Sequence, residues 1–407
     1  MSTVIATGRD QSRVIGLVCT AHFMSHFYIL LLPPLFPVLR DSYGVGFTEL
    51  AFAVSAFSLT TGIAQAPVGF LVDRFGAPKL LIAGMLLESL AFVLIGMFPV
   101  YPALVGLMVV AGLANAVYHP ADYAILNARV DEQRMGRAFS FHTSAGLLGA
   151  AMAPVTMATL MLLGDWRSAV ITSGAIGLCI ALLLMANGDL LREARADIGR
   201  RREPADGQRS GMSLLFSLPV LMGVLFFVGI GMTGHAMSTF GVSVLAEMYA
   251  APLEQVAPVL TCYLFAGPVG VLLGGWIADR VRRHDQVAAC CFALVAACVF
   301  AVAGLDMPLL VTALLFTAAG LFAGVVSPSR DMMIRAVTPP GEMGKVFGFV
   351  STGFNIGGIL APPLYGFLLD TGDPSLVFYT AGVISLLTIG TVLVTGEQGR
   401  RARTYSR

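Results

Sequence analysis

The chain has 407 residues, of which 57% are hydrophobic and only 12% are charged, and its formal net charge is +1. A soluble domain carries about 25% charged residues, so this composition argues against a soluble enzyme and predicts a protein that spans a membrane. We find no basic patch interleaved with exposed aromatic residues, and therefore expect no nucleic-acid partner.

Long apolar runs alternate with short polar turns along the whole sequence. About 20 residues are needed to cross the hydrocarbon as a helix, and open sheet edges cannot face lipid, so these runs predict an all-α integral membrane protein. The first run is too long for a cleavable signal, and we interpret it as a retained span. The twelve predicted spans cover 14–39, 47–72, 79–98, 102–127, 137–163, 166–188, 214–245, 254–278, 285–304, 307–329, 344–369 and 375–395.

Basic residues fix the predicted orientation. When the turns are assigned alternately to the two faces, all of the 25 Lys and Arg residues except Arg40 and Arg167 fall on one side. Basic residues stay cytoplasmic, so we expect an inner (plasma) membrane protein with both termini in the cytoplasm. The predicted organisation is a six-helix bundle over 1–188, a charged cytoplasmic linker over 189–213, and a second bundle with a cytoplasmic tail over 214–407.

The two halves repeat each other. A shift of 208 residues places Ala111-Gly112-Leu113 on Ala319-Gly320-Leu321, and Ala153-Pro154 on Ala361-Pro362. Both copies have the same membrane orientation, so an even number of spans separates them. Such parallel repeats predict two pseudo-symmetric six-helix bundles with a substrate site between them.

Two matching loops carry a family motif. The first reads Gly69-Phe70-Leu71-Val72-Asp73-Arg74-Phe75-Gly76, and the second reads Gly275-Trp276-Ile277-Ala278-Asp279-Arg280. Both resemble the Gly-x-Leu-x-Asp-Arg-x-Gly-Arg-Lys signature of the major facilitator superfamily. The resemblance implies twelve helices that alternate access to a central site, with these loops as a cytoplasmic latch. The latch residues would be Gly69, Asp73, Arg74, Gly275, Asp279 and Arg280. We also expect Gly69 to let its helix approach a neighbour closely.

A narrower resemblance lies in the first and fourth spans. Their sequences Ala21-His22-Phe23-Met24-Ser25-His26 and Val117-Tyr118-His119-Pro120-Ala121-Asp122 are similar to those of the fosmidomycin-resistance efflux branch. That branch has Asn-Asp where this chain has Ser25-His26, and a Glu where it has Ala121. The resemblance favours proton-linked efflux, and these departures leave the coupling carboxylate open.

Ionisable groups within spans are the candidate site residues, because each costs about 2.5–3.5 kcal/mol to insert. His22 and His26 are four residues apart and share one helix face, where they can bind an anion or relay a proton. Alternatively, they are neutral and bonded between helices. Tyr118, His119 and Asp122 lie within one turn of the fourth span.

A carboxylate beside an imidazole suits a proton-linked switch. Alternatively, Asp122 is simply solvated. Pro120 removes a backbone donor and is expected to loosen this helix.

The second half offers a group of opposite charge. The 208-residue shift aligns Arg330 with Asp122 and leaves Ser327 in place of His119. We expect either an ion pair between Asp122 and Arg330 that closes the cytoplasmic side, or two interfacial anchors. Lesser candidates are His142, His235 and Asn355. Glu88 in the third span is expected to be protonated or paired rather than functional.

The function predicted from these features is secondary active transport of a small organic solute, with proton-linked efflux as the leading hypothesis. The alternative is proton-coupled uptake of an organic anion, bound by the histidines and Arg330. A non-transporting membrane sensor is a remote third possibility. Besides lipid, the expected partners are the substrate and protons, and we expect a monomer.

Enzymatic chemistry and resident cofactors are not expected. The six cysteines lie in apolar runs without metal-ligand spacing, and the adjacent pair Cys290-Cys291 points two ways on a helix. We therefore predict no metal site. No phosphate-binding loop is present, which argues against an ATP-driven pump, and no serine lies on a recognisable nucleophile elbow.

Overall fold

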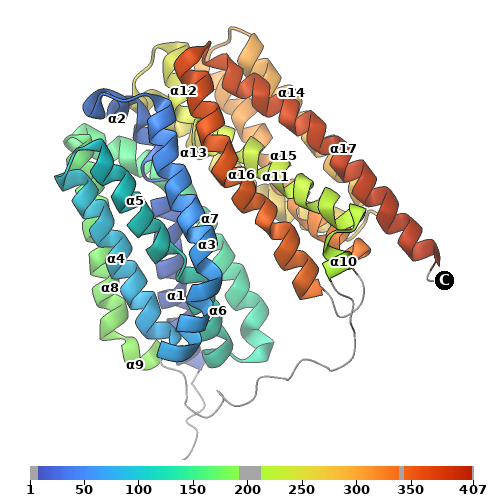
Figure 1. Ribbon diagram of the computed structural model, residues 1–407, viewed down its shortest axis with the longest axis horizontal. Helices are drawn as coiled ribbons and strands as arrows, with labels where there is room; N and C mark the ends of the chain where they lie inside the picture. Colours follow the sequence, from blue (N-terminus) through green and yellow to red (C-terminus); the bar gives the residue numbers. More distant parts are fainter. Residues whose placement is uncertain (1–7, 192–211, 339–342, 406–407) are drawn as a thin grey trace, which may run out of the picture. The chain divides into compact units, whose positions relative to one another are not determined.

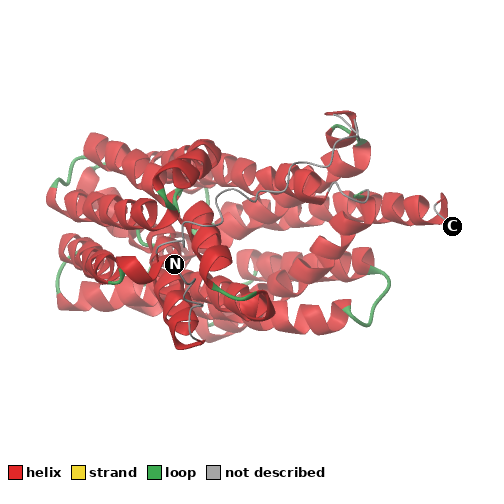
Figure 2. Cartoon of the chain, turned by 90° about the horizontal axis from the view of Figure 1, so that it is seen from below, coloured by secondary structure: helices red, strands yellow, loops and turns green. Residues whose placement is uncertain are grey.

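The protein is described by a computed structural model that covers residues 8–191, 212–338 and 343–405. Within these residues the chain forms helices joined by short turns, and no strand occurs among them (Figures 1 and 2). The α-helices are α1 (Gly8–Ile29), α2 (Phe36–Tyr43), α3 (Phe47–Phe75), α4 (Ala77–Met97), α5 (Tyr101–Asn115), α6 (Tyr118–Arg129), α7 (Glu132–Leu163), α8 (Trp166–Ala186), α9 (Gly188–Leu191), α10 (Met212–Leu215), α11 (Leu218–Ser238), α12 (Gly241–Tyr249), α13 (Leu253–Ala278), α14 (His284–Gly304), α15 (Leu309–Val337), α16 (Met343–Thr371) and α17 (Ser375–Tyr405), with a short 3-10 helix at Pro33–Leu35.

Eleven of the predicted spans are long and apolar enough to cross a membrane in the described part of the chain. The remaining prediction, 344–369, is also helical and corresponds to the 29 residues of α16. Its glycines, the exposed Asn355 and the adjacent Pro362 and Pro363 make it less apolar than the other spans. The prediction of an all-helical membrane protein is therefore confirmed.

In three of the predicted spans the helix is interrupted. α1 gives way to α2 through Pro33–Leu35, α5 gives way to α6 at Ala116 and Val117, and α11 gives way to α12 at Thr239 and Phe240. The α5–α6 break lies just before Pro120, which was expected to loosen the fourth span. The equivalent Pro328 lies inside the continuous α15, so the proline alone does not produce the break.

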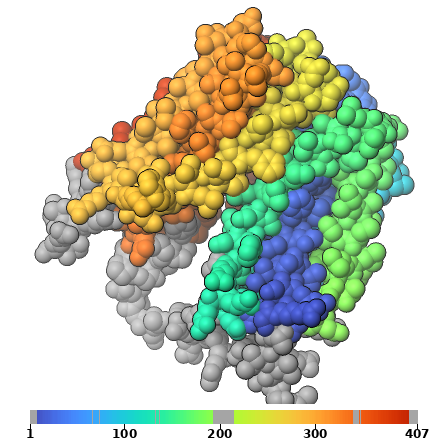
Figure 3. Space-filling view, turned by 180° about the vertical axis from the view of Figure 1, so that it is seen from behind, coloured from blue at the N-terminus to red at the C-terminus, as the bar shows by residue number. Residues whose placement is uncertain are grey.

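Contacts group the chain into two compact units. One consists of Met1–Leu32 and Ala56–Arg209, and the other of Pro33–Ser55 and Ser210–Arg407. The second unit thus includes the end of the first predicted span and the start of the second. The predicted division at residues 189–213 assigns both of these segments to the first bundle. In the first unit, α4 packs along α8 (Figure 1), and α1 lies against α7 and α8 on the face shown in Figure 3.

Glycines allow the closest helix approaches, and these approaches repeat in both units. A Cβ on Gly112 would collide with the carbonyl of Phe57, and one on the equivalent Gly320 would collide with the carbonyl of Tyr263. Gly69, which was expected to make such an approach, makes none within its own unit. Apart from its chain neighbours and the backbone of its own helix, no described atom lies within 4 Å of where its Cβ would be, and the same holds for Gly275. The Gly76 backbone has φ +92°, so the turn after the first Asp-Arg motif needs a glycine there.

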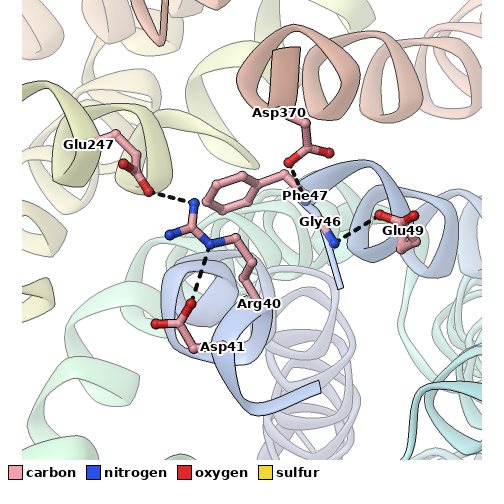
Figure 4. A network of polar contacts seen from close by, with 7 residues as sticks. All are labelled: Arg40, Asp41, Gly46, Phe47, Glu49, Glu247 and Asp370. Atoms are coloured by element: carbon pink, nitrogen blue, oxygen red, sulfur yellow. Dashed lines mark hydrogen bonds and ion pairs between the residues drawn. The ribbon is translucent and has the colours of Figure 1, made fainter. Parts of the chain in front are cut away.

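The segment Pro33–Ser55 is held in the second unit by charged contacts (Figure 4). Arg40 Nη1 donates to Glu247 Oε1 at 2.9 Å. Asp370 accepts from the backbone nitrogens of Phe47 and Thr48, each at 2.7 Å, and so caps the first turn of α3. A carboxylate at a helix N-terminus satisfies free N–H groups and interacts favourably with the helix dipole.

Candidate functional site

Three of the predicted candidates meet in the interior of the first unit. His22 of α1, Asp122 of α6 and His142 of α7 are 3%, 0% and 1% exposed. Asp122 Oδ2 lies 3.0 Å from His142 Nε2 and 3.4 Å from His22 Nδ1. The His22 and His142 rings are stacked, with their centroids 3.6 Å apart. We call His22, Asp122 and His142 the imidazole–carboxylate cluster.

Two further histidines surround this cluster. The ring of His26 lies 4.6 Å from that of His22, and the ring of His119 lies 5.1 Å from it. Gly146 of α7 makes room for them, because a Cβ there would lie 2.8 Å from His22 Nε2 and 3.0 Å from His26 Cδ2. Four of the chain's six histidines therefore gather in one place, although they come from three helices.

The cluster retains unused hydrogen-bonding capacity. Asp122 Oδ1, His22 Nδ1 and His119 Nδ1 are buried and have no hydrogen-bond partner among the described residues. Buried polar atoms without partners are unfavourable, and in a native protein they commonly mark a ligand site. Chemically, a carboxylate between two imidazoles can share a proton or coordinate a cation.

Tyr118, also predicted for this site, takes part in different contacts. Its hydroxyl donates to Met85 Sδ of α4 at 3.5 Å, and its side chain is 1% exposed.

A second polar network surrounds Glu88, which was expected from the sequence to be protonated or paired. Glu88 of α4 is fully buried, and its Oε1 accepts from Asn115 Nδ2 at 3.0 Å. The same Asn115 nitrogen lies 3.4 Å from Ser25 Oγ, on the α1 turn between His22 and His26. Glu88 Oε2 has no partner within the described residues. The sequence signal for this network was the carboxyl group of Glu88 within an apolar run. Its neighbours come from α1 and α5, and the sequence does not show that these helices lie beside Glu88.

A pocket of about 580 Å³ adjoins the cluster between α1 and α7. Cys19, one turn before His22, and Ala145, next to Gly146, are among its lining residues. Arg134 and Arg137 also line it, and Arg134 Nη1 donates to the carbonyl of Gly8 at 3.0 Å.

In the second unit, Arg330 of α15 lies against two aromatic rings. Its guanidinium carbon is 4.9 Å from the ring centre of Phe227 and 5.5 Å from that of Phe354. Arg330 Nε donates to Asp331 Oδ1 at 2.8 Å, and its two Nη atoms have no protein partner in the described part of the chain. Asp122 and Arg330 thus each have partners in their own unit.

The other second-half candidates do not gather into one cluster with Arg330. His235 Nδ1 lies 3.0 Å from Thr239 Oγ1, next to the α11–α12 break. Asn355 is exposed, and Ser327 is partly buried.

The charged latch residues are exposed where the structure describes them, whereas Gly69 and Gly275 are partly buried. Arg74 lies over the ring of Phe75, and Arg280 lies over the ring of Trp276 while donating to that residue's carbonyl. Asp279 is exposed as well, and the side chain of Asp73 lies outside the described residues. The latch role stays a prediction.

The fold and the polar interior define a multi-pass membrane transport protein. The model of the Major Facilitator Superfamily matches residues 18–253 and 222–406. The chain therefore belongs to the Major Facilitator Superfamily, as the paired Asp-Arg loops predicted. This is a family of secondary transporters of small solutes and not of enzymes.

Similar proteins include transporters of different solutes. The probable sulfoacetate transporter SauU of Cupriavidus necator is 25% identical over 94% of this chain and 92% of its own length. The fosmidomycin resistance protein of Escherichia coli is 20% identical over 95% and 93%. The probable L-galactonate transporter of Escherichia coli is 26% identical, but the match covers only 59% of this chain and 55% of that protein.

Among solved structures, a bacterial homolog of the human lysosomal transporter Spinster matches with a TM-score of 0.76. It shares 13% identity over 98% of both chains. At that identity the match shows the fold alone.

Proposed function

We propose that the protein is a secondary active transporter that moves a small organic anion by alternating access, driven by a proton gradient. The observation that carries this proposal is Arg330. The structure continues α15 to Val337, so Arg330 lies within a candidate span rather than in the predicted turn after residue 329. Ionisable groups within spans are costly, so their presence usually has a functional reason. Guanidinium binds a carboxylate or sulfonate with two parallel hydrogen bonds, and the two free Nη atoms are the donors that such contacts need.

The surroundings of Arg330 support this role. The faces of Phe227 and Phe354 interact favourably with the cation and hold the planar group in place. Only Nε is engaged, by Asp331, whose side chain is 47% exposed. The Arg330 side chain itself is 17% exposed, so it is held largely inside the protein with its terminal nitrogens unpaired.

Two of the similar proteins support an anionic substrate. The names of SauU and of the probable L-galactonate transporter indicate substrates that are small organic anions. Protons are the proposed coupling ion because members of this superfamily are often proton-coupled. We also propose the orientation that the basic residues predict, with both termini in the cytoplasm.

Proteoliposome uptake tests the proposal. Purified protein is reconstituted, a pH gradient is imposed, and uptake of labelled sulfoacetate, hexonates and other small organic acids is measured. We expect uptake of at least one anion to depend on the gradient, and Arg330→Gln to weaken its apparent affinity by about tenfold to hundredfold. That range corresponds to the loss of a charged hydrogen-bond donor worth about 1.5–3 kcal/mol.

The matched control is Arg167→Gln. The Arg167 guanidinium also lies over an aromatic ring, that of Trp166, but its side chain is exposed and lies outside the proposed site. It should leave substrate affinity unchanged. Uptake that ignores the pH gradient, or that is equally affected by both substitutions, would refute the proposal.

Proton-linked efflux is the second candidate. It is favoured by the similarity to the fosmidomycin resistance protein along nearly the whole chain. The same proteoliposomes separate the two functions by the direction of proton movement. A solute added outside acidifies the lumen if it enters together with protons, and makes the lumen more alkaline if it exchanges against them.

A further inference from the structure

We propose that His22, Asp122 and His142 form a binding site for a divalent transition-metal ion of the Zn²⁺ class. The three side chains offer one ligand atom each, and these atoms lie within 4.8 Å of one another. The sequence did not indicate the site, because its ligands are 100 and 20 residues apart and come from α1, α6 and α7. The proposal does not depend on which solute the protein transports.

The ligand spacing fits a tetrahedral ion. In such a site the ligand atoms lie about 2.0–2.1 Å from zinc, which places neighbouring ligand atoms about 3.3 Å apart. Here Asp122 Oδ2 lies 3.0 Å from His142 Nε2 and 3.4 Å from His22 Nδ1. These two distances match tetrahedral spacing, and all three ligand atoms lie within 4.8 Å of one another.

The donor set selects the class of ion. Two imidazole nitrogens and one carboxylate oxygen suit Zn²⁺ and its neighbours Co²⁺ and Ni²⁺. Ca²⁺ and Mg²⁺ prefer six or more oxygen ligands, which this site lacks. Three protein ligands leave one coordination position open. The nearby His119 Nδ1 is also without a partner among the described residues.

The protein leaves these ligand atoms available. His22, Asp122 and His142 are at most 3% exposed, and neither His22 Nδ1 nor Asp122 Oδ1 is hydrogen-bonded to another described residue. An ion would give His22 Nδ1 a partner and would convert the single His142–Asp122 hydrogen bond into two coordination bonds.

Metal binding requires a local rotation of the imidazoles. The His22 and His142 rings are stacked at 20°, so both nitrogen lone pairs point at one ion only after the rings open. Gly146 lets the His22 ring pack closely against α7, because a Cβ at this position would lie 2.8 Å from His22 Nε2. The pocket between α1 and α7 is lined by Cys19, one turn from His22, and by Phe141, next to His142.

Direct titration of the purified, full-length protein tests the site. The protein is purified with an affinity tag that contains no histidine, treated with chelator, and titrated with Zn²⁺ by calorimetry and with Co²⁺ by visible absorption. We expect one ion per chain and a Co²⁺ spectrum of a four-coordinate nitrogen–oxygen site. His22→Gln, His142→Gln and Asp122→Asn should each weaken binding by at least about tenfold, since changes even to groups that only orient metal ligands cost about 10- to 100-fold.

Two matched controls make the result specific. His26→Gln alters a histidine in contact with His22 but outside the ligand set, and His235→Gln alters a buried histidine of the second unit. Both should retain Zn²⁺ affinity and the Co²⁺ spectrum. The Gln and Asn replacements preserve side-chain size, and size-exclusion profiles verify that each variant is folded.

Either of two results would overturn the proposal. One is a wild-type protein that takes up no Zn²⁺ or Co²⁺. The other is a folded His142→Gln or His22→Gln variant that binds both ions as the wild type does. Neither result bears on the organic-anion uptake assay, because this titration measures binding without transport.

Discussion

The two halves of the molecule place opposite chemistry at equivalent positions. Gly149 packs on the carbonyl of Phe23, and its repeat mate Gly357 packs on the carbonyl of Val228. This correspondence aligns His22 with Phe227. The 208-residue shift likewise aligns Asp122 with Arg330 and Gly146 with Phe354.

In the first half, then, a buried carboxylate is flanked by imidazoles. In the second half, a guanidinium is flanked by aromatic rings. Each arrangement stabilises its charge by a different means, hydrogen bonding in one case and cation–π contact in the other. The duplicated scaffold has kept the glycine contacts that set helix spacing, while the interior side chains have diverged in charge and chemistry.

The largest expected effect on stability comes from substituting the paired glycines Gly149 and Gly357, which tests whether the two halves pack equally tightly. A Cβ at position 149 would collide with the Phe23 backbone, whereas one at position 357 would lie 3.0 Å from the carbonyl oxygen of Val228. Overpacking costs about 1–3 kcal/mol, more when backbone has to move. We therefore expect Gly149→Ala to lower unfolding stability in detergent by about 3 kcal/mol and Gly357→Ala by about 1 kcal/mol. Gly234→Ala, with open space around it, is the control. Equal losses at 149 and 357 would break the comparison.

The next effect concerns the polar interior of the first half. Glu88→Ala removes the acceptor of Asn115 and leaves a cavity, which we expect to cost about 2 kcal/mol. Glu88→Gln keeps an acceptor oxygen and should cost less than half of that. Ser385→Ala in the second half loses one neutral hydrogen bond, to the carbonyl of Phe292, at about 1 kcal/mol. Chemical unfolding measures the loss of unfolding free energy for each of the three variants. If Ser385→Ala loses as much as Glu88→Ala, the buried Glu88–Asn115 pair stabilises the first half no more than a single neutral hydrogen bond stabilises the second.

A smaller effect is expected where Pro33–Ser55 joins the second unit. Asp370→Ala removes the cap of α3, and such losses cost about 1 kcal/mol. Glu247→Ala breaks an ion pair whose arginine side chain is 37% exposed and should cost less, under about 0.5 kcal/mol. Thermal unfolding of both variants provides the measurement, and a larger loss for Glu247→Ala would contradict this ranking.

The smallest expected effect is the pH-dependent stabilisation that one capping aspartate provides in each half. Asp165 before α8 and Asp373 before α17 are repeat mates. The Ser168 backbone nitrogen lowers the pKa of Asp165, and the Ser375 backbone nitrogen lowers the pKa of Asp373. A depressed folded-state pKa adds stability above the unfolded-state pKa, and that stability is lost as pH falls through the folded value.

Asp165→Asn and Asp373→Asn should therefore each lower the unfolding temperature slightly at pH 7. The difference from wild type should shrink below about pH 4, near the ordinary pKa of Asp. Both groups are exposed, so we expect shifts of similar and small size. A difference that persists unchanged in acid would rule out the charge as its cause.

The chain's order of polar and apolar residues was enough to predict the helices, the repeat and the family. Membrane-length apolar runs must be helical, because lipid offers no hydrogen bonds to the backbone. The paired Asp-Arg loops and the alignment of Arg330 with Asp122 depend only on sequence spacing. Pro120 indicated where the fourth span is weakened, because proline lacks an N–H, although the continuous α15 around Pro328 shows that a proline alone does not produce a break.

Only some of the candidate site residues could be predicted from the sequence. His22, His119 and Asp122 were found because charge in an apolar run is costly. His142 was ranked as a lesser candidate although it is the hydrogen-bond partner of Asp122. Glu88 was expected to be protonated or paired, and its hydrogen bond with Asn115 agrees with this expectation, although the partner itself was not predicted. Gly69 was expected to pack closely, yet the close approaches are made by Gly112, Gly149 and their repeat mates.

Sequence by itself thus determined which segments enter the membrane and which side chains are costly there, because both follow from the transfer of individual groups into lipid. Tertiary structure alone decided that His142 meets Asp122 and His22, and that Phe227 and Phe354 flank Arg330. Those contacts depend on how helices far apart in the chain pack and rotate against one another, and no spacing along a single helix specifies that geometry.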